Sequence, residues 1–253
     1  MATRAVETNY EVAFSDLGGA ALAQFSPREV KQLEFKNAKR VQKTIVSGTE
    51  KKVLVWLANH MPGFINSDHL TALGFAAQFM VGVSYAMSIY DMRWLWAATA
   101  FLGVNWFGDS LDGTVARVRN RQRPRYGFYV DHLIDSFGAV FLCGGLAFSG
   151  FMSPVVAGIL LVAFLMLSIE TYLATYCLGK FKLGHFFLGP TEIRLILGLG
   201  NVVLFYKPHV HFLGALYPLF DLGGVIASIG MFFMLIVIAI RHTALLYREE
   251  RLP

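Results

Sequence analysis

Charged residues are scarce in this chain of 253 residues. Only 15% of them are Asp, Glu, Lys or Arg, whereas 55% are hydrophobic. A soluble domain carries about a quarter charged residues, so the composition excludes an ordinary soluble enzyme. The apolar residues come in runs close to the ~20 residues that cross a bilayer. We therefore predict an integral, multi-pass membrane protein that has the lipid bilayer as a partner and no nucleic-acid partner.

Cysteine is scarcer still, with Cys143 and Cys177 alone in the sequence. Both lie within apolar runs, so we expect neither a disulfide framework nor a zinc site. The N-terminal residues include Glu7, Glu11 and Asp16 and form no compact apolar stretch. This pattern predicts no cleaved signal peptide.

Six apolar segments follow one another along the chain. They cover residues 69–90, 94–116, 127–149, 154–178, 191–207 and 221–246. Backbone polar groups in lipid must be satisfied within a segment, so these should be helices. Lys and Arg gather before the first segment, after the second and fourth, and at the chain end, which places those regions in the cytoplasm. We predict an all-α fold with six transmembrane helices and both termini cytoplasmic.

The segments divide the chain into three expected regions. Residues 1–66 form a cytoplasmic or interfacial region, residues 67–246 the six-helix transmembrane domain, and residues 247–253 a short cytoplasmic tail. Within the first region, Ser47–Glu50 reads as a capping box that opens a short amphipathic helix. That helix either lies in the lipid headgroup plane or packs against the cytoplasmic ends of the bundle.

Four aspartates stand where the second and third apolar segments meet, namely Asp109, Asp112, Asp131 and Asp135. Helix geometry places the first two within about 60° of each other and the last two within about 40°. The joining loop is short, so we expect the two helices to be antiparallel neighbours whose acidic pairs face each other. Carboxylates gathered in this way repel unless cations neutralise them, and their oxygens suit magnesium, manganese or calcium.

Small residues and an arginine surround the acidic pairs. Gly113 and Ala116 keep the helix face of Asp109 open, and Gly127 begins the third segment. Arg117 can bind phosphate with its planar guanidinium. These residues together predict a phosphate-bearing substrate held by divalent ions. In the alternative, the aspartates cap helices or pair with loop arginines, which accounts for one or two of them but not for all four.

The stretches 109–117 and 127–135 resemble the signature of the CDP-alcohol phosphotransferases (CDP-alcohol phosphatidyltransferases). That signature reads D-x-x-D-G-x-x-A-R, a spacer, and G-x-x-x-D-x-x-x-D, and every fixed residue is present. The spacer is one residue longer than the usual pattern, in a basic loop where an insertion is well tolerated. The resemblance extends over roughly residues 65–246 and agrees with the family's six-helix architecture.

The resemblance implies transfer of a phosphate-linked group from a CDP-alcohol to an acceptor hydroxyl, with release of CMP. It implies that the four aspartates hold two divalent cations, Mg²⁺ or Mn²⁺. It also implies that Asp135 takes the proton of the acceptor and that the transmembrane domain is catalytic, at the cytoplasmic face. The nucleotide would be bound by Gly113, Ala116, Arg117 and Gly127. Family members also suggest a homodimer.

Two branches of the family differ in substrate. One uses CDP-choline or CDP-ethanolamine with a diacylglycerol; the other uses CDP-diacylglycerol with inositol, inositol phosphate or glycerol phosphate. The stretches 170–172 and 189–192 resemble the first branch and favour it slightly. Candidate contacts to the acceptor or headgroup are Glu192, Arg194, Asn66 and Thr71. Helix capping and snorkelling to the interface explain these residues equally well.

Two other classes of protein remain open. A divalent-cation transporter also carries carboxylates in a membrane, but it should place them near the bilayer midplane. Here they gather at the expected cytoplasmic helix ends. A catalytically silent, nucleotide-binding scaffold is the second alternative, and the intact acidic set disfavours it.

Overall fold

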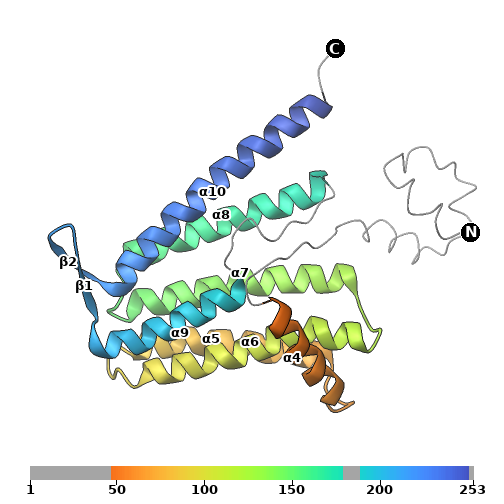
Figure 1. Ribbon diagram of the computed structural model, residues 1–253, viewed down its shortest axis with the longest axis horizontal. Helices are drawn as coiled ribbons and strands as arrows, with labels where there is room; N and C mark the ends of the chain where they lie inside the picture. Colours follow the sequence, from red (N-terminus) through yellow and green to blue (C-terminus); the bar gives the residue numbers. More distant parts are fainter. Residues whose placement is uncertain (1–46, 179–188, 251–253) are drawn as a thin grey trace, which may run out of the picture.

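The structure is a computed structural model that describes residues 47–178 and 189–250. Most of the expected N-terminal region and the end of the expected tail lie outside these residues. The described residues form seven helices and one hairpin (Figure 1). In chain order these are α4 (Ser47–His60), α5 (Ser67–Met87), α6 (Trp94–Val118), α7 (Pro124–Phe148), α8 (Pro154–Leu178), α9 (Pro190–Tyr206), β1 (His209–Phe212), β2 (Ala215–Pro218) and α10 (Leu219–Glu249).

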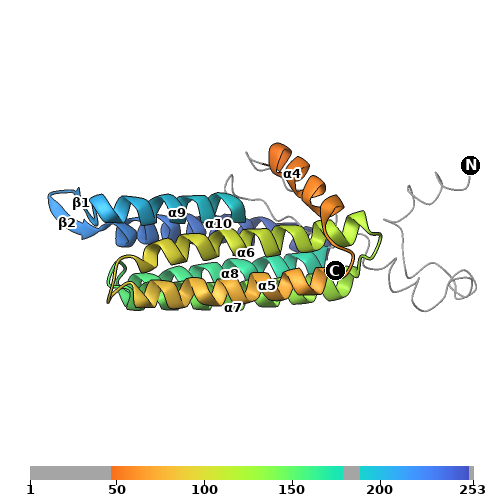
Figure 2. The same ribbon diagram turned by 90° about the horizontal axis from the view of Figure 1, so that it is seen from below.

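The chain is mostly helical, as the sequence predicts, and the helices α5 to α9 run side by side (Figure 2). Four helices are long and apolar enough to cross a membrane, namely α5, α7, α8 and α10. This agrees with an integral membrane protein. Helix α6 coincides with the second expected segment but carries two aspartates, and α9 has 17 residues. The six crossings and their orientation therefore stay predictions.

A β-hairpin between α9 and α10 was not predicted. Strands β1 and β2 pair antiparallel, with His209 opposite Pro218 and Phe212 opposite Ala215. The turn consists of Leu213 at φ 49° and Gly214 at φ 83°. Two successive residues at positive φ match the turn that the twist of a hairpin favours. The hairpin lies at the opposite end of the bundle from α4 (Figure 1).

Helix α5 packs against both α6 and α7, whereas α6 and α7 make few direct contacts in the described chain. The expectation that α6 and α7 are neighbours is therefore wrong. Glycines explain the arrangement, because a Cβ on Gly108 of α6 would lie 2.6 Å from the nitrogen of Gly74 on α5. A Cβ on Gly145 of α7 would likewise collide with Gly82 of α5. Small residues let membrane helices approach closely, and here they admit α5 between the other two.

Helix α4 packs across the end of α6 that leads into α7. Its Leu54 and Ala58 are buried in a cluster with Leu111 and Val115 of α6. Trp56 lies on another face of α4 and is 59% exposed. One face of α4 thus packs against the bundle, and the location of its other face in the headgroup plane stays a prediction.

Candidate functional site

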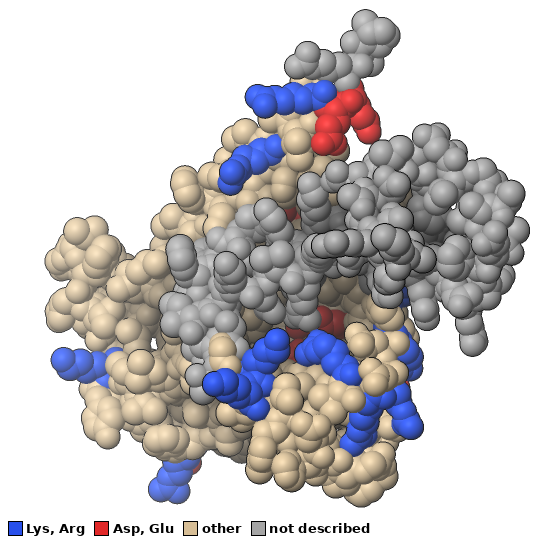
Figure 3. All heavy atoms as spheres, turned by 45° about the vertical axis from the view of Figure 1, so that its right-hand side comes forward, with Lys and Arg blue, Asp and Glu red and all other residues tan. Residues whose placement is uncertain are grey.

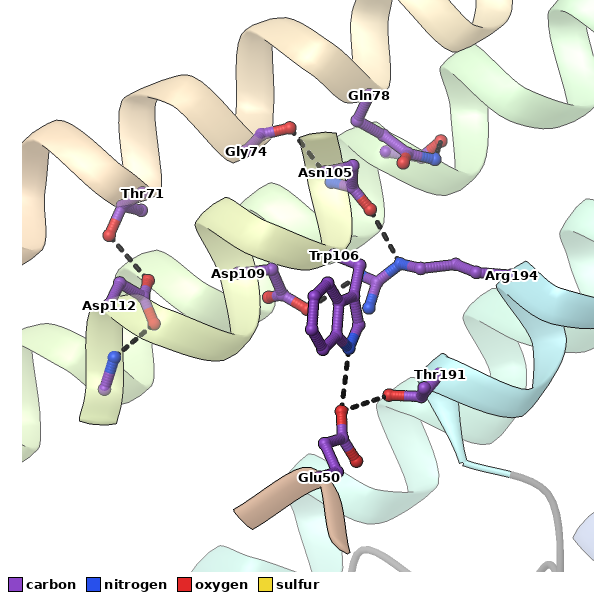
Figure 4. Close-up of polar contacts among 12 residues, drawn as sticks. Glu50, Thr71, Gly74, Gln78, Asn105, Trp106, Asp109, Asp112, Thr191 and Arg194 are labelled. Carbon is purple, nitrogen blue, oxygen red and sulfur yellow. Dashed lines mark hydrogen bonds and ion pairs between the residues drawn. The ribbon is translucent and has the colours of Figure 1, made fainter. Parts of the chain in front are cut away.

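Asp112 on α6 is held by neutral hydrogen-bond donors. Its Oδ2 accepts a hydrogen bond of 2.6 Å from the hydroxyl of Thr71 on α5, and its Oδ1 accepts one from the backbone N–H of Gly113. Thr71, a candidate substrate contact from the sequence, therefore contacts an aspartate of the predicted metal site in this structure. Figure 4 shows that α5 and α6 meet at this pair.

Asp109, one turn earlier on α6, is paired with a cation instead. Arg194 on α9 donates through Nη2 to Oδ2 of Asp109 at 2.7 Å and through Nε to Oδ1 of Asn105 at 2.7 Å (Figure 4). Asn105 is buried and donates its own Nδ2 to the carbonyl of Gly74 at 2.9 Å. The side chain of Arg194 is only 15% exposed, so it points into the bundle and does not snorkel. Asp109 thus has an internal counter-ion.

Helix α7 brings the other two aspartates toward the same place. The charges of Asp109 and Asp131 both act on the carboxyl group of Asp112. Asp131 and Asp135 both act on Tyr172 of α8, whose hydroxyl donates to the carbonyl of His132 at 3.4 Å. Asp109 and Asp131 therefore each lie within electrostatic reach of Asp112, and Asp131 and Asp135 each lie within electrostatic reach of Tyr172.

These carboxylates fit divalent cations by chemistry, because hard oxygen ligands are those that Mg²⁺ and Mn²⁺ prefer. Their present spacing is wider than that of an assembled metal site. Among residues 47–178 and 189–250, no three His, Cys, Asp or Glu side chains are grouped closely enough to hold an ion. The pairing of Asp109 with Arg194 agrees with this spacing. The carboxylates thus have the chemistry that an ion needs, while hydrogen bonds from Thr71, Gly113 and Arg194 offset the charge of two of them in this structure.

The predicted nucleotide-binding residues occupy three places. A Cβ on Gly113 would lie 3.4 Å from Nη1 of Arg117, so the guanidinium of Arg117 lies over this glycine. A Cβ on Gly127 would have no neighbour within 4 Å, so the start of α7 is open at that point. Ala116 instead lines a cavity of about 390 Å³. The other lining residues are Asn66, Ser67, Asp68, Val115, Arg119, Arg121, Gln122 and Arg123.

Two arginines of the α6–α7 loop organise the wall of this cavity. Arg119 donates to the carbonyls of Met61, Pro62 and Ile65, and Arg123 forms an ion pair with Asp68 of α5. Figure 3 shows basic side chains gathered around recessed acidic side chains on one face of the molecule. The loop arginines therefore hold the beginning of α5 in place.

The first two turns of α9 contain two buried polar atoms that have no hydrogen-bond partner among the described residues. Glu192 caps the helix through Oε2, which accepts from the backbone N–H of Gly189 at 2.9 Å, while its Oε1 is unpartnered. Arg194 uses Nε and Nη2 as described above, while its Nη1 is unpartnered. Buried polar groups are nearly always hydrogen-bonded, so both atoms lack the partners that their burial would lead one to expect.

Three residues connect α4, α6 and α9, a role that the sequence predicted for none of them. Oε1 of Glu50 accepts hydrogen bonds from Nε1 of Trp106 at 2.8 Å and from the hydroxyl of Thr191 at 2.7 Å (Figure 4). The sequence suggested only a capping role for Glu50. Its partners lie 56 and 141 positions away, and no local pattern reports such a distance.

Comparison with known proteins identifies the family of the chain. The family model of the CDP-alcohol phosphatidyltransferases matches residues 64–240, which include α5 to α9 and all four aspartates. No curated protein matches the chain. Members of this family transfer a phosphate-linked alcohol from a CDP-alcohol in phospholipid synthesis and generally depend on divalent cations. The chain therefore belongs to the CDP-alcohol phosphatidyltransferase family and is a membrane transferase of substituted phosphate groups.

Proposed function

We propose that the chain transfers phosphocholine or phosphoethanolamine from the CDP-alcohol to the hydroxyl of a diacylglycerol and releases CMP. The observation that carries the proposal is that the charges of Asp109 and Asp131 both reach Asp112, within the region that the family model matches. Helices α6 and α7 make few direct contacts, so packing alone gives no reason for their carboxylates to lie near one another. A site for a phosphate-bearing substrate does give such a reason.

The four aspartates Asp109, Asp112, Asp131 and Asp135 would hold two divalent cations, Mg²⁺ or Mn²⁺. When bound, such ions offset the charge of the diphosphate and of the departing CMP. The acceptor oxygen forms a bond to the phosphorus that carries the alcohol, the bond from that phosphorus to CMP breaks, and Asp135 takes the hydroxyl proton. Arg117 lies over Gly113 and would orient the diphosphate with its guanidinium. The open surface at Gly127 and the wall at Ala116 would receive the nucleotide.

Glu192 and Arg194 support the choice of branch. The unpartnered Oε1 of Glu192 is a buried anionic acceptor, which suits the cationic choline or ethanolamine group. The unpartnered Nη1 of Arg194 is a donor for phosphate oxygen. The same donor also suits a phosphorylated acceptor, so CDP-diacylglycerol with inositol phosphate or glycerol phosphate is the second candidate. Asn66, at the cavity, and Thr71, through Asp112, would complete the ligand contacts.

The proposed enzyme crosses the membrane six times, has both termini in the cytoplasm and acts at the cytoplasmic face as a homodimer. A site at that face lets a soluble nucleotide meet a lipid. The exposed Val53 and Trp56 of α4, next to Lys51 and Lys52, suit a helix in the headgroup plane. Residues 1–66 would then form an interfacial region before the catalytic domain at 67–246 and the tail at 247–253.

The test measures CMP release by the purified protein in lipid nanodiscs, with Mg²⁺ or Mn²⁺ in the buffer, for each combination of CDP-alcohol donor and acceptor. We expect CMP release with CDP-choline or CDP-ethanolamine plus diacylglycerol, and a matching phospholipid by mass spectrometry. Turnover only with CDP-diacylglycerol and a polar alcohol would establish the second candidate. The absence of CMP from every pair, together with Mn²⁺ uptake into proteoliposomes, would replace the proposal with a cation transporter.

A further inference from the structure

Glu50 connects two helices of the site, although it precedes the region that the family model matches. It lies in the first turn of α4 and is partly buried. A single carboxylate oxygen accepts hydrogen bonds from Trp106 on α6 and from Thr191 on α9 (Figure 4). Both donors are neutral and the acceptor is charged, so these hydrogen bonds are stronger than bonds between neutral groups.

The two donors lie close to the residues of the acid site on their own helices. Trp106 directly follows Asn105 and precedes Asp109 by less than one turn, and Thr191 precedes Arg194 by less than one turn. Arg194 in turn contacts both Asn105 and Asp109. Helices α6 and α9 are thus connected twice, once through Glu50 and once through Arg194. Because a helix is rigid over one turn, the first connection limits the positions that Arg194 can take.

Attachment of α4 to the bundle does not require this bridge. Leu54 and Ala58 already bury α4 against Leu111 and Val115 of α6. The hydrogen bond from Thr191 reaches a different helix, with which α4 makes few other contacts in the described chain. The bridge therefore acts between α6 and α9 as well as on α4.

Arg194 has an unpartnered donor beside the acid site. Its Nη1 is buried and without a partner among the described residues, while Nε and Nη2 are fixed by Asn105 and Asp109. A buried guanidinium N–H without an acceptor is unfavourable unless a ligand supplies one. Beside the carboxylates of a phosphate-transferring enzyme, the matching acceptor is a phosphate oxygen.

We propose that Glu50 is a positioning residue that clamps α9 onto α6 and thereby holds Nη1 of Arg194 toward a phosphate group of the substrate. This inference rests on the proposed function. The phosphate belongs either to the diphosphate of the donor or to a phosphorylated acceptor, and titrations with each ligand distinguish these sources.

The sharpest variant is Thr191→Val, which removes the α9 side of the clamp and leaves α4 attached through Trp106 and its apolar contacts. Thr191→Ser keeps the hydroxyl and is the matched control, and Asn59→Ala on the exposed side of α4 controls for changes in that helix. We measure the dissociation constants of CDP-choline and of glycerol phosphate by calorimetry, and the thermal midpoint of each variant. We expect Thr191→Val and Glu50→Ala to weaken one of the two ligands about tenfold, as the misplacement of one charge-assisted hydrogen bond would. Thr191→Ser, Glu50→Gln and Asn59→Ala should stay within about threefold of the wild type.

A double-mutant cycle with Arg194→Gln separates positioning from simple stabilisation. If Glu50 acts through Arg194, Thr191→Val causes no further loss of affinity in the Arg194→Gln background. Additive losses, or a lower thermal midpoint with unchanged affinity for both ligands, would overturn the inference. The wild type is measured alongside, because a wild type that turns over no CDP-alcohol refutes the proposed function, whereas an active wild type with additive variants refutes the clamp alone.

Discussion

The two sides of α6 balance their aspartates in different ways. On the α5 side, Asp112 accepts hydrogen bonds from a hydroxyl and a backbone N–H, both neutral. On the α9 side, Asp109 is paired with the guanidinium of Arg194. Neutral donors leave a carboxylate its full charge for a metal ion, whereas an arginine competes with one. The comparison teaches that two aspartates of one signature can have different surroundings: in the proposed metal site, Asp112 would meet an ion with only neutral donors around it, whereas Asp109 would have a counter-ion that the ion must replace or share.

The largest effect should come from α7, which belongs to neither of the two sides compared above. Asp135→Asn on α7 removes the proposed base and keeps the size of the side chain. We expect the rate of CMP release to fall by about 10²–10⁴-fold, the usual contribution of a positioned base. Binding of the CDP-alcohol, measured by calorimetry, should largely survive. Undiminished turnover would show that the proton goes elsewhere.

On the α9 side, Arg194→Gln removes the competing cation. We expect Mn²⁺ to bind about tenfold more tightly, because the like charge beside Asp109 is gone, while turnover falls. Electron paramagnetic resonance of Mn²⁺ reports the affinity independently of activity. Arg194→Lys keeps the charge and is the control. Weaker Mn²⁺ binding in Arg194→Gln would mean that Arg194 builds the ion site, and the contrast between the two sides would disappear.

The hydrogen bond from Thr71 to Asp112 depends on the close approach of α5 to α6. Gly108→Ala places a Cβ 2.6 Å from the backbone nitrogen of Gly74, and that backbone cannot move aside easily. We expect a loss of about 1–3 kcal/mol in stability, as is typical of overpacking. Gly103→Ala on the same helix is the control, since its Cβ has no neighbour within 4 Å. Equal thermal midpoints for the two variants would contradict the packing of α5 against α6.

The smallest effect should come from Thr71→Val, which removes a neutral donor to Asp112. We expect a loss of about 1 kcal/mol in stability, the net worth of one hydrogen bond. Mn²⁺ affinity should change much less than in Arg194→Gln, because no charge is removed. Thr71→Ser should restore the wild-type behaviour. A change in Mn²⁺ affinity as large as that of the arginine variant would show that the two sides of α6 do not differ in kind.

Local periodicity and a short signature were sufficient to find the acidic residues and most helices. Asp109 and Asp112 lie on one helix, and the first half of the signature spans only nine residues, so a local pattern is enough to find them. The position of α5 between α6 and α7 was missed because it depends on which glycines meet, and Gly74, Gly82 and Gly145 show no such pairing in the sequence. The hairpin was missed because its turn contains Leu213, a residue that seldom takes positive φ.

The contacts of Arg194 and Glu50 were beyond reach for a different reason. A buried ion pair or a bridging carboxylate is set by the packing of helices that are distant in the chain, and neither partner carries a local mark of it. The sequence offered Arg194 as a contact to the acceptor or headgroup or as a residue that snorkels, and Glu50 as part of a helix cap. Their roles emerge only when α4, α6 and α9 are placed together (Figure 4).

The central claim is that carboxylates of α6 and α7 gather around divalent cations to receive a nucleotide diphosphate. It is tested most directly by counting Mn²⁺ ions per chain by electron paramagnetic resonance in the presence of CMP, in the wild type and in Asp112→Asn. The account predicts two ions in the wild type and fewer, more weakly held ions in the variant, whose side chain has lost its charge. A wild type that binds no Mn²⁺ with CMP, or a variant that binds it equally well, would contradict the account.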